Sequence, residues 1–254
     1  MTLPDPVLFS IGSFSVRWYG VCVTLGVLCA VLLCAAREKR YSLPKDTTLD
    51  LLFVALPAAI IGARIYYVAF SWEQFREHPI SALYFWQGGI AIYGAILMGA
   101  LAAFVFAKRR KISFATLASL VAPALPLGQA IGRWGNFFNQ EAYGIPITDA
   151  RLQFFPVAVW IESTDGWFAA TFFYESLWCF LLCGFLLLYE RKYGGRELFP
   201  LYCAFYALER FFVEGLRTDS LYWGNIRASQ ALSLAVIVIC AMRWVVLAIK
   251  RRRT

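Results

Sequence analysis

The sequence predicts an all-α polytopic membrane protein with seven transmembrane helices, an external N-terminus, a cytoplasmic C-terminus and a small external cap domain. Of its 254 residues, 60% are hydrophobic and only 16% are charged, whereas soluble domains average about 45–50% apolar and about 25% charged residues. The mean hydropathy is +0.61, and uncharged stretches alternate with short basic runs. A bilayer is therefore expected to cover much of a single integral domain that spans residues 1–254.

A membrane helix needs about 20 mainly apolar residues. The stretches that meet this length are Trp18–Ala36, Leu49–Phe70, Gly88–Ala107, Phe114–Gly132, Trp167–Tyr189, Leu198–Val213 and Gln230–Ile249. The sixth is short and carries Glu209 and Arg210.

The connections between these stretches differ in charge. Those assigned to one side of the membrane hold 15 Lys and Arg residues, and those on the other side hold 6. The positive-inside rule places the basic side, with the C-terminus, in the cytoplasm. The longest external connection, residues 133–166, is the predicted cap between the fourth and fifth helices, and partial alternation in RLQFFPVAVWIES predicts a small strand pair or compact cap there.

Composition also excludes other classes of protein. The net charge of +8 comes mainly from basic runs at the ends of apolar segments, which are orientation signals, so no nucleic-acid partner is expected. The seven cysteines all lie in apolar stretches without the spacing of a zinc site or a disulfide framework. No nucleotide-binding loop or metal cluster is visible, so no metal and no cofactor are expected.

Charged residues inside spans are functional candidates by default. Arg64, Glu175, Glu209 and Arg210 lie on three predicted helices, all toward the outer leaflet. Two interpretations stay open: these charges bind an anionic substrate, or they pair with one another and hold the helices together.

The external segment GRWGNFFNQEAYG (132–144) carries the densest polar pattern. If the fourth helix continues outward, Arg133, Asn136 and Gln140 share one face. Arg133 offers a planar fork that suits phosphate, and Asn136 and Asn139 offer neutral donors. The segment VEGLRTDS brings Arg217, with Glu214 and Asp219, to the same surface. These features predict a site for an anionic head group, although a solvated helix end with interfacial arginines is the simpler alternative.

The chain resembles the prolipoprotein diacylglyceryl transferase family. GRWGNFFNQEAYG fits the family signature, roughly G-R-x-G-N-F-x-N-x-E-x-x-G, at each fixed position. Further matches follow in the same order along the chain, namely FSIGSFSVRWYG (9–20), GARIYY (62–67), WQGGIAIYGAILMG (86–99), TFFYES (171–176), ERFFVEGLRTD (209–219) and NIRASQALSL (225–234).

The resemblance implies transfer of the diacylglyceryl group of phosphatidylglycerol to the lipobox cysteine of a preprolipoprotein signal peptide. It further implies a bacterial cytoplasmic (inner) membrane enzyme with its active site toward the outer leaflet, and we expect a monomer. The expected catalytic residues are Arg133, Arg217, Tyr93, Tyr19 and Glu141. The expected phosphatidylglycerol-binding residues are Arg133, Asn136, Asn139, Gly144, Arg64 and Arg217, with Glu175, Glu209 and Arg210 in support.

Two departures from the family pattern leave the proton acceptor open. Tyr93 stands where many members have histidine, and Ala169 and Ala170 replace a frequent His-Pro pair. Glu141 or Glu209 is then the base, or electrostatics alone generates the thiolate, while Tyr93 is alternatively a hydrogen-bond donor to phosphate. A lipid or anion transporter using the same arginines is the competing function, but the inner halves of the spans are almost wholly apolar. A structural scaffold without chemistry is the third possibility.

Overall fold

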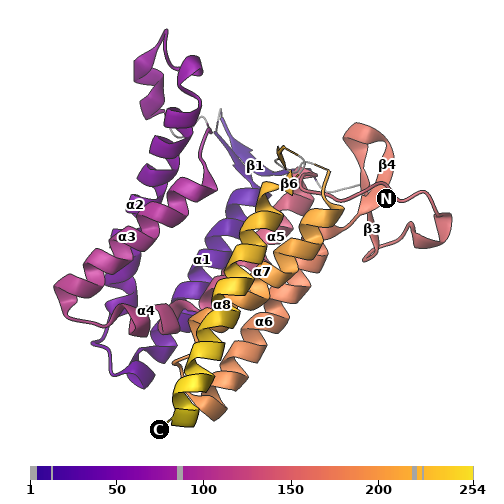
Figure 1. Cartoon of the computed structure of the whole chain (residues 1–254). Helices are drawn as coiled ribbons and strands as arrows, with labels where there is room; N and C mark the ends of the chain where they lie inside the picture. The colour runs from indigo at the N-terminus through magenta and orange to yellow at the C-terminus, as the bar shows by residue number, and fades with distance from the viewer. Residues whose placement is uncertain (1–4, 13, 85–87, 219–221, 225, 254) are drawn as a thin grey trace. The chain divides into compact units, whose positions relative to one another are not determined.

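The structure is a computed structural model that describes residues 5–12, 14–84, 88–218, 222–224 and 226–253. Ser13, Trp86, Gln87, Asp219, Ser220 and Asn225 of the motifs above lie outside these residues. The elements are β1 (Val7–Ile11), β2 (Phe14–Arg17), α1 (Trp18–Arg37), α2 (Thr47–Phe70), α3 (Ile92–Arg110), α4 (Phe114–Val121), α5 (Ala124–Asn139), β3 (Ala158–Ile161), β4 (Gly166–Ala169), α6 (Thr171–Tyr193), α7 (Leu198–Leu216), β5 (Tyr222–Trp223), β6 (Ile226–Arg227) and α8 (Ala228–Arg253). The fold is mostly helical, as predicted, with short antiparallel hairpins added (Figure 1).

Within the described residues, five helices are long and apolar enough to cross a membrane. They are α1, α2, α3, α6 and α8, and α4 with α5 would form a sixth span that is bent by 41°. Pro123 lies at this break, where its missing N–H and its ring interrupt helical hydrogen bonding. The predicted sixth span is covered by α7, which carries Glu209, Arg210 and Glu214 and is not among the candidate spans found within the described residues. Five or six spans are thus supported, and seven stays a prediction.

The predicted bounds differ most at the cap. Residues 133–139, assigned to the cap, form the last turns of α5. Trp167, assigned to the fifth span, lies instead in β4 and pairs with Trp160 of β3. The predicted strand pair is therefore present, but its second strand lies beyond RLQFFPVAVWIES. We call residues 145–169 the hairpin lobe.

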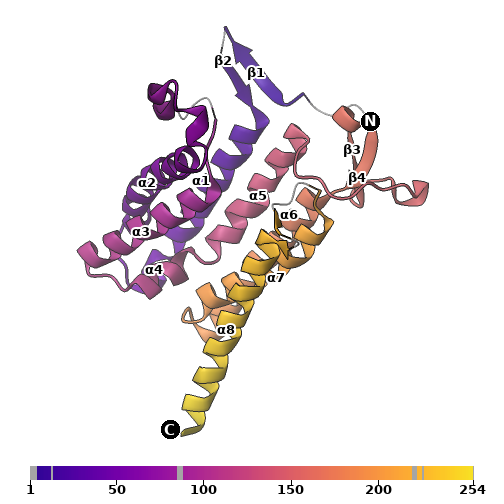
Figure 2. The same ribbon diagram turned by 45° about the horizontal axis from the view of Figure 1, so that its top comes forward.

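The chain divides into two compact units, Leu33–Leu120 and the combination of Met1–Leu32 with Val121–Thr254. In the larger unit, α6, α7 and α8 run side by side (Figure 2). A core of Ala122, Leu182, Leu186, Leu198 and Tyr202 joins α6 to α7. A second core lies where the hairpin lobe meets α5 and α6, and it includes Val159, Ile161, Ala170 and Phe172.

The smaller unit is built on the close pairing of α2 with α3. Gly62 and Gly94 face each other so closely that a Cβ on Gly94 would lie 2.2 Å from the Gly62 carbonyl oxygen. Small residues of this kind let membrane helices approach backbone to backbone. The contact fixes the first turn of α3, which carries Tyr93.

Candidate functional site

The signature segment lies at the end of α5. Arg133, Asn136 and Asn139 are helical, and the helix ends at Asn139. Gln140 adopts a left-handed conformation with φ of 51°, so the prediction that it continues the helical face is wrong. Its side-chain oxygen accepts a hydrogen bond from the Glu162 backbone N–H at 2.8 Å and so fastens the hairpin lobe to the end of α5.

A buried carboxylate organises the arginines of the larger unit. Glu175 of α6 is only 1% exposed, and it forms ion pairs with Arg133 of α5 and with Arg210 of α7, the latter at 3.1 Å. The Arg217 guanidinium, just beyond α7, is 4.0 Å from the second Glu175 oxygen. Three guanidinium groups from separate parts of the chain thus converge on one carboxylate, and we call these four residues the arginine cluster.

Glu214 extends the arginine cluster toward α8. Its carboxylate pairs with Arg210 one helical turn earlier, and its backbone carbonyl accepts a hydrogen bond from Arg227. Arg227 was not among the predicted site residues, although it lies in the family motif NIRASQALSL. Arg227, which directly precedes α8, is therefore linked to the arginine cluster through Glu214.

Glu209 differs from the other carboxylates of α7. It is 3% exposed, and neither of its side-chain oxygens has a hydrogen-bond partner among the described residues. It lies within electrostatic reach of Arg133, Arg210 and Arg217. Burial of a charge without a hydrogen-bond partner is costly, and Glu209 also faces the carboxylate of Glu175.

The two signature asparagines bind the signature glutamate. Glu141 accepts hydrogen bonds from the Asn136 amide at 2.9 Å and from the Asn139 amide at 3.4 Å. Its carboxylate is at the exposed side of the site. The asparagines hold this carboxylate in place, so the described partner of their amide donors is a residue of the protein itself.

Tyr19 and Gly144 are brought to the same region by close contacts. Tyr19, in the first turn of α1, packs on Gly135, where a Cβ would lie 2.8 Å from its ring. Gly144 forms an isolated bridge with Arg217, and a Cβ there would lie 2.8 Å from the Ala169 Cβ and 2.9 Å from the Thr171 methyl. Position 144 therefore has no room for a Cβ, which explains a glycine there.

Arg64 and Tyr93 belong to the smaller unit. The Arg64 guanidinium donates to four backbone carbonyls, those of Ser81, Ala82, Gly88 and Gly89, at 2.7–2.8 Å. These bonds clamp the loop between α2 and α3. Tyr93 is 37% exposed, and its ring lies 6.3 Å from that of Tyr66. The contacts described for Arg64 and Tyr93 thus lie within the smaller unit.

The chemistry available at the cluster is recognition of an anion. Within the described residues Glu175 is the one ionic partner of Arg133, so most of its five N–H donors remain for a ligand. A shallow concavity of about 540 Å³ lies elsewhere, on the hairpin lobe, and its lining includes Gln153, Trp160, Asp165 and Trp167. None of the predicted site residues lines it, so it is separate from the arginine cluster.

Comparison with known proteins agrees with the motifs. Residues 6–246 match the family described as prolipoprotein diacylglyceryl transferase. A Listeria welshimeri protein named phosphatidylglycerol–prolipoprotein diacylglyceryl transferase is 46% identical over 242 residues, covering 92% of this chain and 87% of the relative. A Clostridium botulinum protein of the same name is 43% identical over 244 residues, covering 92% and 94%. The chain therefore belongs to the prolipoprotein diacylglyceryl transferase family, whose members are transferases.

Proposed function

We propose that this protein transfers the diacylglyceryl group of phosphatidylglycerol to the lipobox cysteine of prolipoproteins. The thiolate sulfur attacks the glycerol carbon that bears the phosphate ester, the carbon–oxygen bond breaks, and glycerol phosphate leaves with the bonding electrons. The thiol proton passes to a base. The arginine cluster carries this proposal. Arg133 lies in the family signature, the other three members lie in the matching motifs TFFYES and ERFFVEGLRTD, and together they gather positive charge that suits a departing phosphate.

The charge change of the reaction explains the need for several arginines. A phosphodiester with one negative charge becomes a monoester that develops a second one. Hydrogen-bond donors that face the developing charge stabilise the transition state most. A single donor of this kind raises the rate by about 10²–10³-fold. Glu175 holds Arg133, Arg210 and Arg217 together, so their guanidinium groups are in place before the phosphate arrives.

We propose Glu141 as the proton acceptor. Its carboxylate is held by two amides at the exposed side of the site, where a peptide thiol can reach it. Glu209 is buried, which suits electrostatic support better than contact with a peptide. We expect Glu141→Gln to lower kcat by about 10²–10⁴-fold, the range for a lost general base, and Glu209→Gln to lower it far less. The reverse ranking, read from initial rates, would assign the base to Glu209.

Tyr93 is proposed as a hydrogen-bond donor to the phosphate. A single neutral hydrogen bond contributes about 0.5–1.5 kcal/mol, so Tyr93→Phe is expected to lower kcat/KM by about 10-fold at most. Full activity of this variant would remove the hydroxyl from the mechanism.

The proposed setting is the bacterial cytoplasmic membrane, with the arginine cluster toward the outer leaflet and the protein as a monomer. The basic runs near Arg37, Arg109, Arg191 and Arg251 then face the cytoplasm.

The direct experiment reconstitutes the purified protein with phosphatidylglycerol and a lipobox peptide. We expect a peptide whose mass increases by one diacylglyceryl group, together with released glycerol phosphate. A peptide with serine in place of cysteine serves as the control and is expected to stay unmodified. Translocation of phosphatidylglycerol across the vesicle membrane without any product would instead support the transporter function.

A further inference from the structure

The hairpin lobe has an apolar edge that the described residues leave about half exposed. Leu152, Phe154 and Phe155 are 44%, 50% and 43% exposed. The run of residues 152–161 contains no charged side chain. Contiguous apolar exposure of this kind marks a surface that binds protein or lipid.

This edge is held firmly against the start of α6. The Phe155 ring lies 5.0 Å from that of Phe173, edge to face, and the Tyr174 hydroxyl donates to the Val157 carbonyl. Phe173 is in the first turn of the candidate span Thr171–Tyr193. The apolar edge therefore lies at the level where a membrane helix begins.

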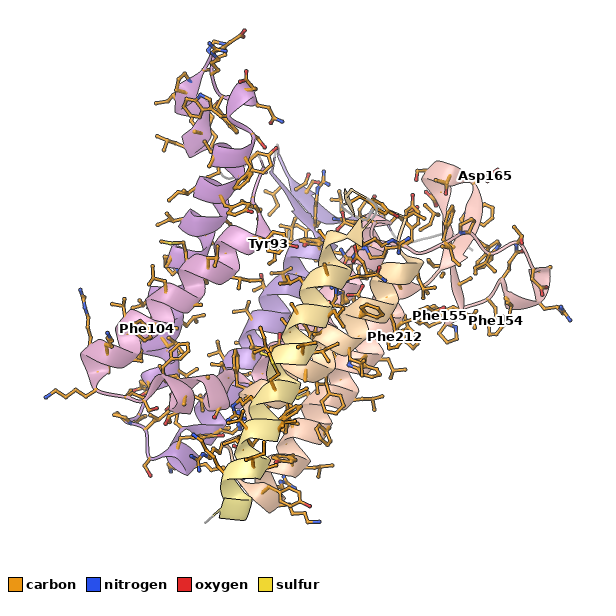
Figure 3. All side chains as sticks on the ribbon, in the orientation of Figure 1. Tyr93, Phe104, Phe154, Phe155, Asp165 and Phe212 are labelled. Carbon is orange, nitrogen blue, oxygen red and sulfur yellow. The ribbon has the colours of Figure 1, made fainter. Side chains whose placement is uncertain are left out.

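The polar groups of the lobe lie elsewhere. In Figure 3, Phe154 and Phe155 point from the edge that faces down the bundle, at the height of Phe212 of α7, whereas Asp165 lies on the opposite edge. Arg151 bonds to Asp149 and lowers the pKa of that carboxyl by this side-chain hydrogen bond, so the pair stays charged. The lobe is thus apolar on one edge and polar on the other.

We propose that residues 152–157 insert into the interfacial layer of the bilayer and anchor the hairpin lobe to the lipid surface. Phe212, which is 65% exposed on α7, continues the same apolar surface along the bundle. This continuity with an exposed phenylalanine of the bundle, beside the candidate span Thr171–Tyr193, is what favours lipid over a protein partner. Aromatic rings of this kind settle at membrane–water interfaces. This inference concerns the membrane alone and holds or fails independently of the proposed reaction.

The experiment compares single-cysteine additions in full-length protein, reconstituted in vesicles of phosphatidylglycerol and phosphatidylethanolamine. Phe154→Cys and Leu152→Cys probe the apolar edge, and Ser163→Cys, in the exposed turn of the same hairpin, is the matched control. The unmodified protein gives the background from its seven native cysteines, of which five are buried. A membrane-impermeant maleimide reports access to water.

We expect Phe154→Cys and Leu152→Cys to react at least about 10-fold more slowly than Ser163→Cys, because the reactive thiolate forms poorly away from water. All three variants should react equally after unfolding in detergent. A bimane on residue 154 should be quenched by lipids with brominated acyl chains, and one on residue 163 should not.

Equal labelling of all three positions in vesicles would overturn the proposal. Protection of residues 152 and 154 that appears only after a lipobox peptide is added would also overturn it, since it would make the apolar edge a peptide-binding surface. Because two positions on the apolar edge are probed, the proposal can still be contradicted if one of the two variants folds poorly.

Discussion

Arg64 and Arg133 were both predicted to bind phosphate, yet the two units hold them in different ways. The Arg64 guanidinium uses four of its five N–H donors in hydrogen bonds to backbone carbonyls of the loop between α2 and α3. Arg133 is held through the carboxylate of Glu175, together with Arg210 and Arg217. The first arrangement gives most of the arginine's N–H donors a protein partner and holds the loop between α2 and α3 in place. The second concentrates positive charge and leaves donors for a ligand, so these two arginines are expected to respond differently to the same substitution.

The largest effect on stability is expected when the centre of the arginine cluster is neutralised. Glu175→Gln leaves three guanidinium groups converging on an amide, and removal of one partner from a buried ion pair costs about 3–5 kcal/mol. Equilibrium unfolding in mixed micelles would measure the loss. Asp149→Asn, which breaks the exposed pair with Arg151, is the control and should leave the free energy of unfolding unchanged. A small loss for Glu175→Gln would show that other contacts hold the arginines.

A smaller loss is expected for Arg64→Lys. The lysine keeps the charge but cannot reach four carbonyls in one plane, and hydrogen bonds to charged groups contribute about 1.5–3 kcal/mol each. Since some bonds are replaced, we expect a loss of about 2 kcal/mol in the same unfolding measurement. Arg110→Lys, at the exposed pair with Asp50, is the matched control in the same unit. Equal stability of both variants would argue against a loop clamp.

Gly144→Ala tests the contact that brings Arg217 to the signature. The added methyl group would meet Ala169 and Thr171 at less than 3 Å, and overpacking costs about 1–3 kcal/mol. Gly184→Ala, on α6 where no heavy atom lies within 4 Å, should instead stabilise by about 0.5–1 kcal/mol. The two substitutions therefore have opposite signs, and two changes of the same sign would contradict the packing described here.

Much of the fold follows from apolar length and basic runs, because a bilayer imposes strict limits on both. The start of α1 at Trp18 and the start of α7 at Leu198 were predicted to the residue. Pro123 marks the break between α4 and α5, and its significance was readable in the sequence although the prediction ran through it.

The candidate site was less accessible to prediction. Helix direction predicted that Glu175 and Arg210 lie toward the same leaflet, together with Arg64 and Glu209, and the motifs predicted Arg133 and Arg217 at an external anion site. The sequence did not predict that Arg133, Arg210 and Arg217 all meet Glu175. The acceptors of Arg64 are backbone carbonyls, which no residue type marks. The role of Gly144 depends on Ala169 and Thr171, which are more than 20 residues away in the sequence and meet it only in the folded structure.

The central claim is that the Arg133 guanidinium donates hydrogen bonds to the departing phosphate, while Arg64 holds a loop. It is tested most directly by lipidation rates of Arg133→Lys and Arg64→Lys, measured in the same vesicles and normalised to folded protein. We expect Arg133→Lys to lower kcat at least about 100-fold, as for a lost transition-state donor, and Arg64→Lys to stay within about 3-fold of the unmodified protein, as for a residue outside the chemistry. An equal loss in both variants, or near-normal turnover in Arg133→Lys, would contradict the claim.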